Sequence, residues 1–384
     1  MDQTRSPKVF ILDPALLLEV KKRIHNQDEK VLGAWQKLKS QAADALNAGP
    51  FSVVHKALTP PSGDKRDYMS IAPYWWPNPH TADGLPYIRR DGEVNPERTK
   101  LDRSAIGNMS SHADTLALAY FYSGEEAFAE KAAQLLRTWF MDEETRMNPH
   151  LNYGQGIRGI CDGRGIGIIE TRELLKVVNA IGLLEGSAAW TAEDQSTLIA
   201  WFTQYLDWLL QSDHGQDEAG QANNHGTHYD VQVAVFSLFT GEKDISKRVI
   251  TESAILRVAS QIEPDGRQPL ELARTKALGY STMNLDGWLD LAAIAASFGI
   301  DLYNYKTADG RGIRAALDYI APFYTEPEAF PYPQIQPMDM NTVMKLLRRG
   351  ALAYDEQEYE RIIDRLPSIN TAQSRIQLLY PAFG

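Results

Sequence analysis

The sequence predicts an all-α protein whose helices pair into hairpins, as in an α/α toroid or a solenoid. Most of the chain repeats apolar residues at the helical period of about 3.6 residues, and the alternation typical of strands is scarce. The helices expected from this pattern come in pairs separated by short turns. No motif recurs at a fixed period, so nothing identifies an open repeat array.

The hairpins can be followed from the beginning of the chain. The first is expected over residues 14–46, and another over residues 112–140, where Ser123-Gly124 separates two amphipathic helices. Glu125 and Glu126 then stand in the first turn of the second helix, where the helix dipole favours negative charge. Further pairs are expected over residues 225–262, 284–321 and 338–366.

A capping box predicts the start of one long helix. Thr191 and Asp194 stand three residues apart, directly before the run "QSTLIAWFTQYLDWLLQSD". This run places apolar side chains along one helical stripe, which we expect to face the core. The stripe consists of Leu198, Trp201, Phe202, Tyr205, Leu206 and Leu209.

Two irregular segments interrupt the helices. Residues 58–108, here called the lid segment, are rich in Pro, Gly, aromatic and charged residues. So long a loop is usually functional or disordered, and its aromatic content argues against disorder, so we expect an ordered lid. Residues 148–167 form a second insert before a helix around 170–184. No interdomain linker is evident, so we expect a single domain over residues 1–384.

Charge and composition narrow the function. The net charge of −11 and the isoelectric point near 5.3 argue against a nucleic-acid surface. Cys161 is the only cysteine, which excludes an internal disulfide and a cysteine-rich metal site. No apolar run is long enough for a membrane span, and no signal core is present. We expect a periplasmic or secreted protein whose leader was removed, with a cytoplasmic location as the alternative.

The stretch "QANNHGTHYDVQ", residues 221–232, admits two interpretations by itself. His225 and His228 stand three apart with Asp230 nearby, but the pattern HExxH and a third ligand are lacking, so no metal is expected. The simpler interpretation is that Asn223 or Asn224 caps a helix.

The glycine-rich run "GRGIG", residues 163–167, follows no predicted strand and lacks the spacing of a nucleotide-binding loop. A turn before a helix is therefore favoured over a phosphate site. Arg164 within it is still a candidate for binding a carboxylate.

The lid segment combines aromatic and basic residues. Trp75 and Trp76 lie between prolines in "PYWWPNP". Adjacent side chains of an extended chain point in opposite directions, so one indole can anchor the lid while the other faces a cleft. Aromatic faces suit sugars, although both indoles could simply pin the loop. The other candidate substrate contacts in the segment are Lys65, Arg66, Tyr68, Arg89 and Arg90.

The stretch "ELARTKALGYSTMNLDGW", residues 271–288, places Arg274 and Tyr280 six apart, just before an apolar helix. A cation beside a phenol favours the phenolate, which makes a tyrosine usable as a general base or acid. Taken alone, these residues would be interpreted as a surface arginine and a core tyrosine.

Together these motifs resemble the alginate lyase superfamily of polysaccharide lyases, in particular family thirty-eight glucuronan and alginate lyases, and more distantly family five mannuronate lyases. The resemblance rests on Asn-Asn-His at 223–225, on "ELARTKALGYSTMNLDGW", and on the lid motifs "DYMSIAPYWWPNP" and "GLPYIRRDGEVNPE". It implies an α/α toroid, an incomplete barrel of about six to seven helical hairpins.

The resemblance also implies the roles of individual residues. Asn224 and His225 are expected at the carboxylate of the scissile sugar, assisted by Arg274, with Tyr280 as catalytic acid and base. In family five the arginine and tyrosine are seven apart, whereas here they are six apart. His228 is expected to be structural, and Tyr229 to be a candidate substrate contact. The implied partner is an anionic polysaccharide, without a cofactor.

Two other functions remain open at this point. A glycoside hydrolase would need two carboxylates across a cleft, and the sequence does not pair any of the candidates. These candidates are Asp162, Glu170, Asp230 and Glu271. A helical carbohydrate-binding protein without activity is the other alternative. The sequence leaves open the preferred polyuronate, internal or terminal cleavage, and the oligomeric state.

Overall fold

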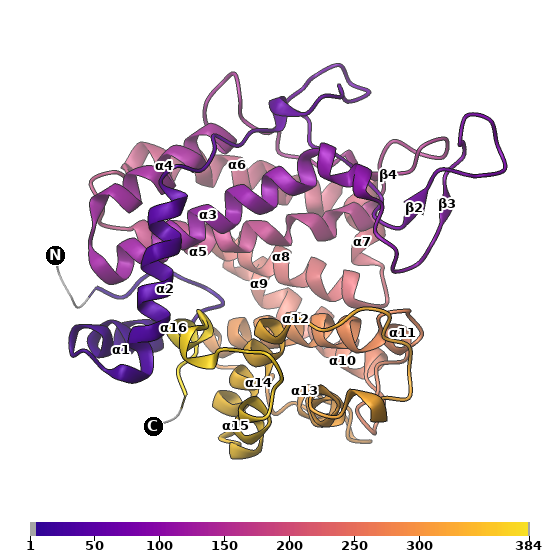
Figure 1. Ribbon diagram of the computed structural model, residues 1–384. Coiled ribbons are helices and arrows are strands. Elements are labelled where there is room, and N and C mark those ends of the chain that lie inside the picture. Colours follow the sequence, from indigo (N-terminus) through magenta and orange to yellow (C-terminus); the bar gives the residue numbers. More distant parts are fainter. Residues whose placement is uncertain (1–4, 383–384) are drawn as a thin grey trace. The chain divides into compact units, whose positions relative to one another are not determined.

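The computed structural model describes residues 5–382 and is built mainly of helices (Figure 1). Within these residues the strands are short and form two separate two-stranded sheets. The all-α prediction is confirmed. None of the described helices combines the length and apolar character needed to span a bilayer.

Contacts divide the chain into two compact units. Unit 1 comprises residues 1–40, 222–234 and 244–384, and unit 2 comprises residues 41–221 and 235–243. Helices α2 (Glu29–Ala45) and α8 (Asn224–Thr240) each run through a boundary between them. The expectation of one domain therefore stays a prediction.

Unit 2 contains the predicted hairpin over residues 112–140, as α3 (Asp102–Ser123) and α4 (Glu126–Phe140). Gly124 ends α3 with a φ of 74°, a left-handed conformation that favours glycine. Helix α3 packs against both α4 and α5 (Leu174–Leu184), which follows a 3-10 helix over Gly165–Glu173. The sequence predicted that the lid segment ends at residue 108, but α3 already begins at Asp102. No side chain caps this helix start; instead Asp102 is buried and forms an ion pair with Lys56.

The predicted capping box begins α6 (Ala192–Gln211). Thr191 accepts from the backbone N–H of Asp194, and the Asp194 side chain accepts from that of Thr191. The predicted stripe is buried: Trp201 packs edge-on against Phe140 at 4.8 Å between ring centroids. Helix α7 (Asp213–Ala219) follows directly.

The lid segment is ordered. It carries β1 (Met69–Ile71), which pairs with β4 (Tyr153–Gly156), and the antiparallel pair β2 (Trp75–Trp76) and β3 (Ile88–Arg89). Two 3-10 helices, Val53–His55 and Pro96–Lys100, flank these strands. The hairpin formed by β2 and β3 projects from the helices of unit 2 (Figure 1).

Unit 1 holds the predicted pairs over residues 284–321 and 338–366, and parts of the pairs over residues 14–46 and 225–262. Its helices are α1 (Pro14–His25), α9 (Lys243–Arg248, which begins in unit 2), α10 (Ile255–Gln261), α11 (Pro269–Leu272), α12 (Ala277–Ser297), α13 (Ile313–Ile320), α14 (Met340–Tyr354), α15 (Gln357–Asp364) and α16 (Ile376–Leu379). A π-helical stretch, Val249–Ala254, joins α9 to α10. The sequence placed the start of α12 at residue 284, but the helix begins at Ala277, so Tyr280 lies inside it.

An ion-pair network around the buried Arg349 and Asp290 connects α14 to α12. Arg349 contacts Asp286 at 3.0 Å and Asp290 at 2.8 Å, and Lys345 contacts Asp286 at 2.9 Å. Burial alone raises the pKa of Asp286, but Lys345 and Arg349 outweigh it and hold that pKa below its ordinary value. Because removing one partner would leave a buried charge unpaired, this network fixes the helix that carries Tyr280.

Candidate active site

The first turn of α8 presents the residues of the Asn-Asn-His motif. Asn223 lies just before the helix, and its Oδ1 accepts from the backbone N–H of His225 at 3.1 Å. Asn223 thus acts as the cap, as the simpler interpretation of this stretch expected. The side chain of Asn224 is fully buried, whereas that of His225 is partly exposed. Direct contact of Asn224 with a substrate therefore requires neighbouring side chains to move.

A buried carboxylate holds Asn224. Glu271 of α11 accepts from the Asn224 backbone N–H through Oε1 and from the Asn224 Nδ2 through Oε2, both at 2.7 Å. Burial raises the pKa of Glu271, while these two hydrogen bonds and the nearby charges of Arg274 and His225 oppose the rise. Glu271 thus contacts Asn224 directly, and the charge of Arg274 also acts on it.

A network of side-chain amides surrounds this contact. Asn284 of α12 donates through Nδ2 to Gln261 at 3.0 Å and to Gln268 at 2.8 Å, and Thr227 of α8 donates to Gln261 at 3.0 Å. All four side chains are buried. The network connects α8, α10, α11 and α12, so the two residues in contact, Asn224 and Glu271, lie on elements that hold each other in place.

Arg274 and Tyr280 meet, as their order in the sequence suggested. Arg274 donates from Nη2 to the Tyr280 Oη at 2.9 Å, and its Cζ lies 4.0 Å from the centroid of the phenol ring. Both side chains are partly exposed. A guanidinium in this position stabilises negative charge on the phenol oxygen.

An extended strap fixes the segment between Arg274 and Tyr280. The backbone of Lys276 pairs with that of Gln334, and Ile335 N donates to Thr275 O at 3.1 Å. The Gln334 side chain accepts from Gly279 N at 3.1 Å, in the first turn of α12. These contacts replace a side-chain cap, which explains why the sequence placed the start of α12 too late.

His228 and Tyr229 lie deeper in α8. The His228 Nε2 lies 3.0 Å from the carbonyl oxygen of Met283, and only 3% of the residue is exposed. This agrees with the structural role expected for His228. Tyr229 is also buried. Among the described residues no group of three His, Cys, Asp or Glu side chains gathers in a way that could hold a metal ion.

The predicted basic residues of the lid segment lie in unit 2 and have local partners. Arg66 contacts Asp64 at 2.8 Å, Arg89 contacts Asp91 at 2.9 Å, and Arg90 lies 3.9 Å from Glu93. Lys65 donates to the carbonyl oxygen of Lys56 at 3.0 Å. The positive charge that the sequence suggested is therefore largely offset within the lid itself.

The two tryptophans take different positions, as expected for neighbours in an extended strand. Trp75 packs against a buried cluster of Ala72, Tyr87 and Ile157. Trp76 donates from Nε1 to the carbonyl oxygen of Glu93 at 2.9 Å, and Arg90 lies 5.4 Å from its ring centroid. Trp75 thus anchors the lid segment, while Trp76 remains the candidate for a sugar contact.

Tyr68 and Arg164 are engaged in the interior of unit 2. Tyr68 is 0% exposed and donates to Glu170 at 2.8 Å, and Ser70 donates to the same carboxylate at 2.5 Å. Arg164 donates to the backbone and side-chain oxygens of Gln155, both at 3.0 Å. Tyr68 is inaccessible in this position, so its expected substrate contact stays a prediction that its burial does not favour.

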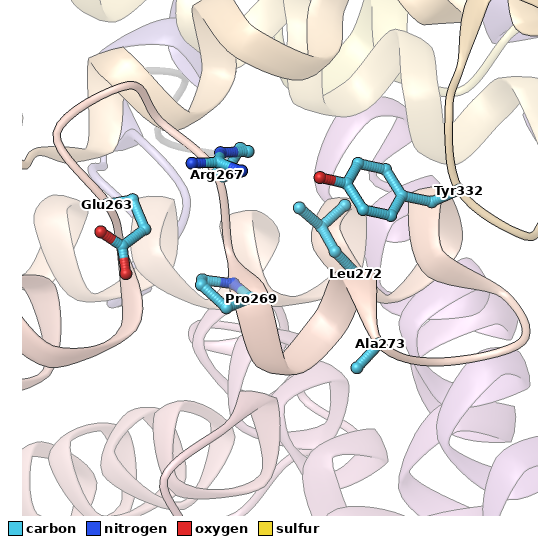
Figure 2. Close-up of a pocket in the computed structure, with 6 residues that line it drawn as sticks. All are labelled: Glu263, Arg267, Pro269, Leu272, Ala273 and Tyr332. Atoms are coloured by element: carbon cyan, nitrogen blue, oxygen red, sulfur yellow. The ribbon is translucent and has the colours of Figure 1, made fainter.

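A cavity of about 330 Å³ lies beside α11 (Figure 2). Its lining includes Arg267, Pro269, Leu272 and Tyr332, whose ring lies next to Leu272 in Figure 2. A second cavity of about 330 Å³ lies in unit 2 beside β1 and residues 156–162. Neither is lined by any of the four predicted catalytic residues.

Sequence reasoning missed the role of Glu271 and the strap around Gln334. The sequence indicates Glu271 only as a candidate catalytic carboxylate of a glycoside hydrolase, because its hydrogen-bond partner Asn224 is 47 positions away. The one available signal was an acidic residue inside the apolar turn "PLEL", where an ionised side chain needs a partner.

The sequence model of the alginate lyase family matches residues 52–330. Among solved structures, an alginate lyase from Bacteroides ovatus is 42% identical and superposes with a TM-score of 0.94, over 97% of this chain and 99% of that chain. No curated protein sequence matches the chain.

More distant structures share the fold alone. A variant of alginate lyase A1-III complexed with tetrasaccharide is 16% identical with a TM-score of 0.60, over 100% of this chain and 99% of that chain. Alginate lyase A1-III from Sphingomonas species A1 is 14% identical with a TM-score of 0.53, over 92% of this chain and 96% of that chain. These likenesses confirm the predicted fold class, the α/α toroid.

Proposed function

The chain belongs to the alginate lyase family and is a polysaccharide lyase acting on polyuronates, and on that premise we propose that it cleaves 4-linked uronates by β-elimination at Tyr280. The observation that carries this proposal is the contact of Arg274 with the Tyr280 hydroxyl at 2.9 Å, in the same unit as Asn224 and His225. The pair provides a phenol whose charged form is stabilised by a fixed cation.

Neutralising the uronate carboxylate is the first requirement of the reaction. The proton on C5 lies next to that carboxylate and is too weakly acidic while the carboxylate keeps its full charge. Donors that stabilise the developing enediolate lower this barrier. His225 and Arg274 are the partly exposed donors, and Asn224 completes the set when substrate binding moves its neighbours.

Tyr280 then performs both proton transfers. As phenolate it takes the C5 proton, the C4=C5 double bond forms, and the bond from C4 to the glycosidic oxygen breaks. The resulting phenol returns the proton to the leaving oxygen. One residue serves both steps where proton and leaving group lie on the same face of the sugar. For the opposite arrangement, His225 acts as the base and Tyr280 as the acid.

The hydrolase alternative finds little support in the candidate carboxylates. Glu271 accepts hydrogen bonds from Asn224, and Glu170 accepts them from Tyr68 and Ser70. Asp230 forms an ion pair with Arg257 at 2.6 Å. Asp162 is exposed. A hydrolase needs one carboxyl group as acid and a second facing it across the bond, and these partners occupy three of the four groups.

The choice of polymer is part of the proposal. We favour mannuronan or glucuronan, and Trp76 stays a candidate for a sugar contact. A polymer does not diffuse across a membrane, which supports the expected location outside the cytoplasm. Cell fractionation followed by an activity assay tests that location.

A panel of defined polyuronates tests the reaction and the substrate together. The expected result is a product with an unsaturated, ultraviolet-absorbing uronate end from mannuronan or glucuronan, and sizing of the products separates internal from terminal cleavage. New reducing ends without ultraviolet absorbance would show hydrolysis instead and would overturn β-elimination.

A further inference from the structure

The Asn224–Glu271 contact has an unusual chemical requirement. Asn224 offers two donors to one side chain, its backbone N–H and its Nδ2, both at 2.7 Å from the Glu271 oxygens. Only a carboxylate presents two acceptors and no donor at this spacing. The contact thus fixes which end of the Asn224 amide faces Glu271 and which end faces away.

Water cannot replace this contact. Asn224 is 0% exposed and Glu271 is 1% exposed. The Asn224 Oδ1 is buried and has no hydrogen-bond partner among the described residues, so no second contact holds the amide from its other end. With Glu271 removed or altered, the amide would lose the only side-chain contact that sets its orientation.

The same carboxylate lies close to two other proposed catalytic groups. The charges of Arg274 and His225 both act on it, and Arg274 follows it by three residues at the end of α11. A negative charge at this point attracts the Arg274 guanidinium. A neutral side chain would not.

From these observations we propose that Glu271 is a positioning residue of the lyase. By accepting one N–H of the Asn224 Nδ2, it orients the amide so that the other N–H of Nδ2, and not the carbonyl oxygen, is offered to the uronate carboxylate. The proposal rests on the proposed function of Asn224. Glu271 acts through Asn224 and exchanges no proton with the sugar. A flipped amide would present an oxygen to an anion, which repels it in the ground state and even more as charge develops in the transition state.

The test is Glu271→Gln, which keeps the size of the side chain but replaces one acceptor with a donor. We expect kcat on the preferred polyuronate to fall about 10- to 100-fold, as for a misplaced catalytic group, with KM changed less than about threefold. Glu263→Gln is the control: it makes the same change at a partly exposed glutamate beside the cavity of Figure 2 and should leave kcat unchanged.

A double-mutant cycle separates positioning from a general loss of structure. Once Asn224→Ala has removed the amide, Glu271→Gln should lower kcat by less than about threefold more, because nothing remains to be oriented. Full additivity of the two effects would overturn the proposal. So would wild-type kcat in Glu271→Gln.

A swapped pair keeps the test valid if Glu271→Gln is poorly folded. In Asn224→Asp combined with Glu271→Gln, the glutamine donates to the new carboxylate and accepts from the backbone N–H, so the melting temperature should return toward that of the wild type. Activity should stay low, because residue 224 no longer has a donor to offer. Recovery of activity together with stability would contradict the orientation that we propose.

The outcomes also distinguish this proposal from the proposed function. A wild-type protein without ultraviolet-absorbing products from any polyuronate would contradict the proposed function itself. A wild type that is active, together with an inactive Tyr280→Phe and a fully active Glu271→Gln, would retain the function and reject only the role of Glu271.

Discussion

Tyr280 meets Arg274 through two parts of its side chain, the hydroxyl oxygen at 2.9 Å and the face of the ring at 4.0 Å. The hydroxyl contact bears on proton transfer, whereas the ring contact bears on packing. A variant that keeps the ring and loses the oxygen can therefore separate the two.

We predict that Tyr280→Phe abolishes turnover while folding and substrate binding persist. The ring of phenylalanine keeps the contact with Arg274, but no oxygen remains to exchange a proton, which should cost at least about 100-fold in kcat. Circular dichroism and equilibrium binding of the polymer provide the controls. Normal turnover by this variant would remove Tyr280 from the mechanism.

At the scale of elements, the close approach of α8 and α12 depends on Gly287. A Cβ at this position would lie 3.1 Å from the Thr227 Cγ2 and 3.2 Å from the His228 Cε1. These distances are tighter than ordinary van der Waals contact, and both neighbours are buried. The space is therefore already filled by the helix that carries Asn224 and His225.

We predict that Gly287→Ala lowers kcat/KM about 10-fold by displacing the first turn of α8 relative to α12. Overpacking costs about 1–3 kcal/mol of unfolding free energy, offset in part by the higher helix propensity of alanine. Gly279→Ala in the same helix is the matched control, because its Cβ would meet nothing closer than 3.7 Å. Equal effects of the two substitutions would contradict this explanation.

The start of α6 combines a capping box with an ion pair. Arg137 donates to the two carboxylate oxygens of Asp194 at 2.7 and 2.6 Å, and Thr191 donates to it at 2.8 Å. The hydrogen bond from Arg137 is the main reason why the pKa of Asp194 falls to about 2. Because the folded-state pKa lies below the ordinary value, ionised Asp194 contributes to the free energy of unfolding above about pH 4. This contribution is lost as the pH falls through about 2.

We predict that Asp194→Asn lowers the free energy of unfolding at neutral pH by about 1–2 kcal/mol, a discounted value because Arg137 is partly exposed. The difference from the wild type should shrink as the pH falls below about 4. Asp207→Asn, at an exposed position of the same helix, is the control. Urea unfolding at several pH values measures the free energy of unfolding of both variants and of the wild type. A difference between Asp194→Asn and the wild type that grows toward acid pH would contradict the prediction.

At the scale of the whole molecule, an acidic chain acts on an acidic polymer. The net charge is −11, and the arginines of the lid segment lie beside carboxylates. Long-range repulsion between enzyme and substrate should therefore outweigh local attraction at low ionic strength.

We predict that raising the salt concentration from about 10 to about 150 mM increases kcat/KM severalfold, because the screening length shortens from about 30 to about 8 Å. The gain should appear in KM, with kcat nearly constant. Sodium chloride and potassium chloride at equal concentration should give the same gain, because screening depends on ionic strength and not on the identity of the cation. A fall of kcat/KM with salt would instead assign the binding energy to the basic residues of the lid segment.

Local signals were enough for much of the helical architecture. The capping box at Thr191, the glycine that ends α3 and the apolar stripe of α6 each depend on residues within about two helical turns. The ion pairs Asp64–Arg66 and Arg89–Asp91 are just as local, and they could have been anticipated from their spacing. The sequence motifs also named the family and the four residues of the proposed site.

Only the tertiary structure decided how those residues meet. Glu271 lies 47 positions from Asn224, and Gln334 lies 55 positions from Gly279, so no local pattern connects them. The start of α12 was misplaced for the same reason, since a distant strap replaces its cap. Sequence determined which side chains are available for the chemistry, while folding decided which donors they meet in the buried interior, where water no longer competes for them.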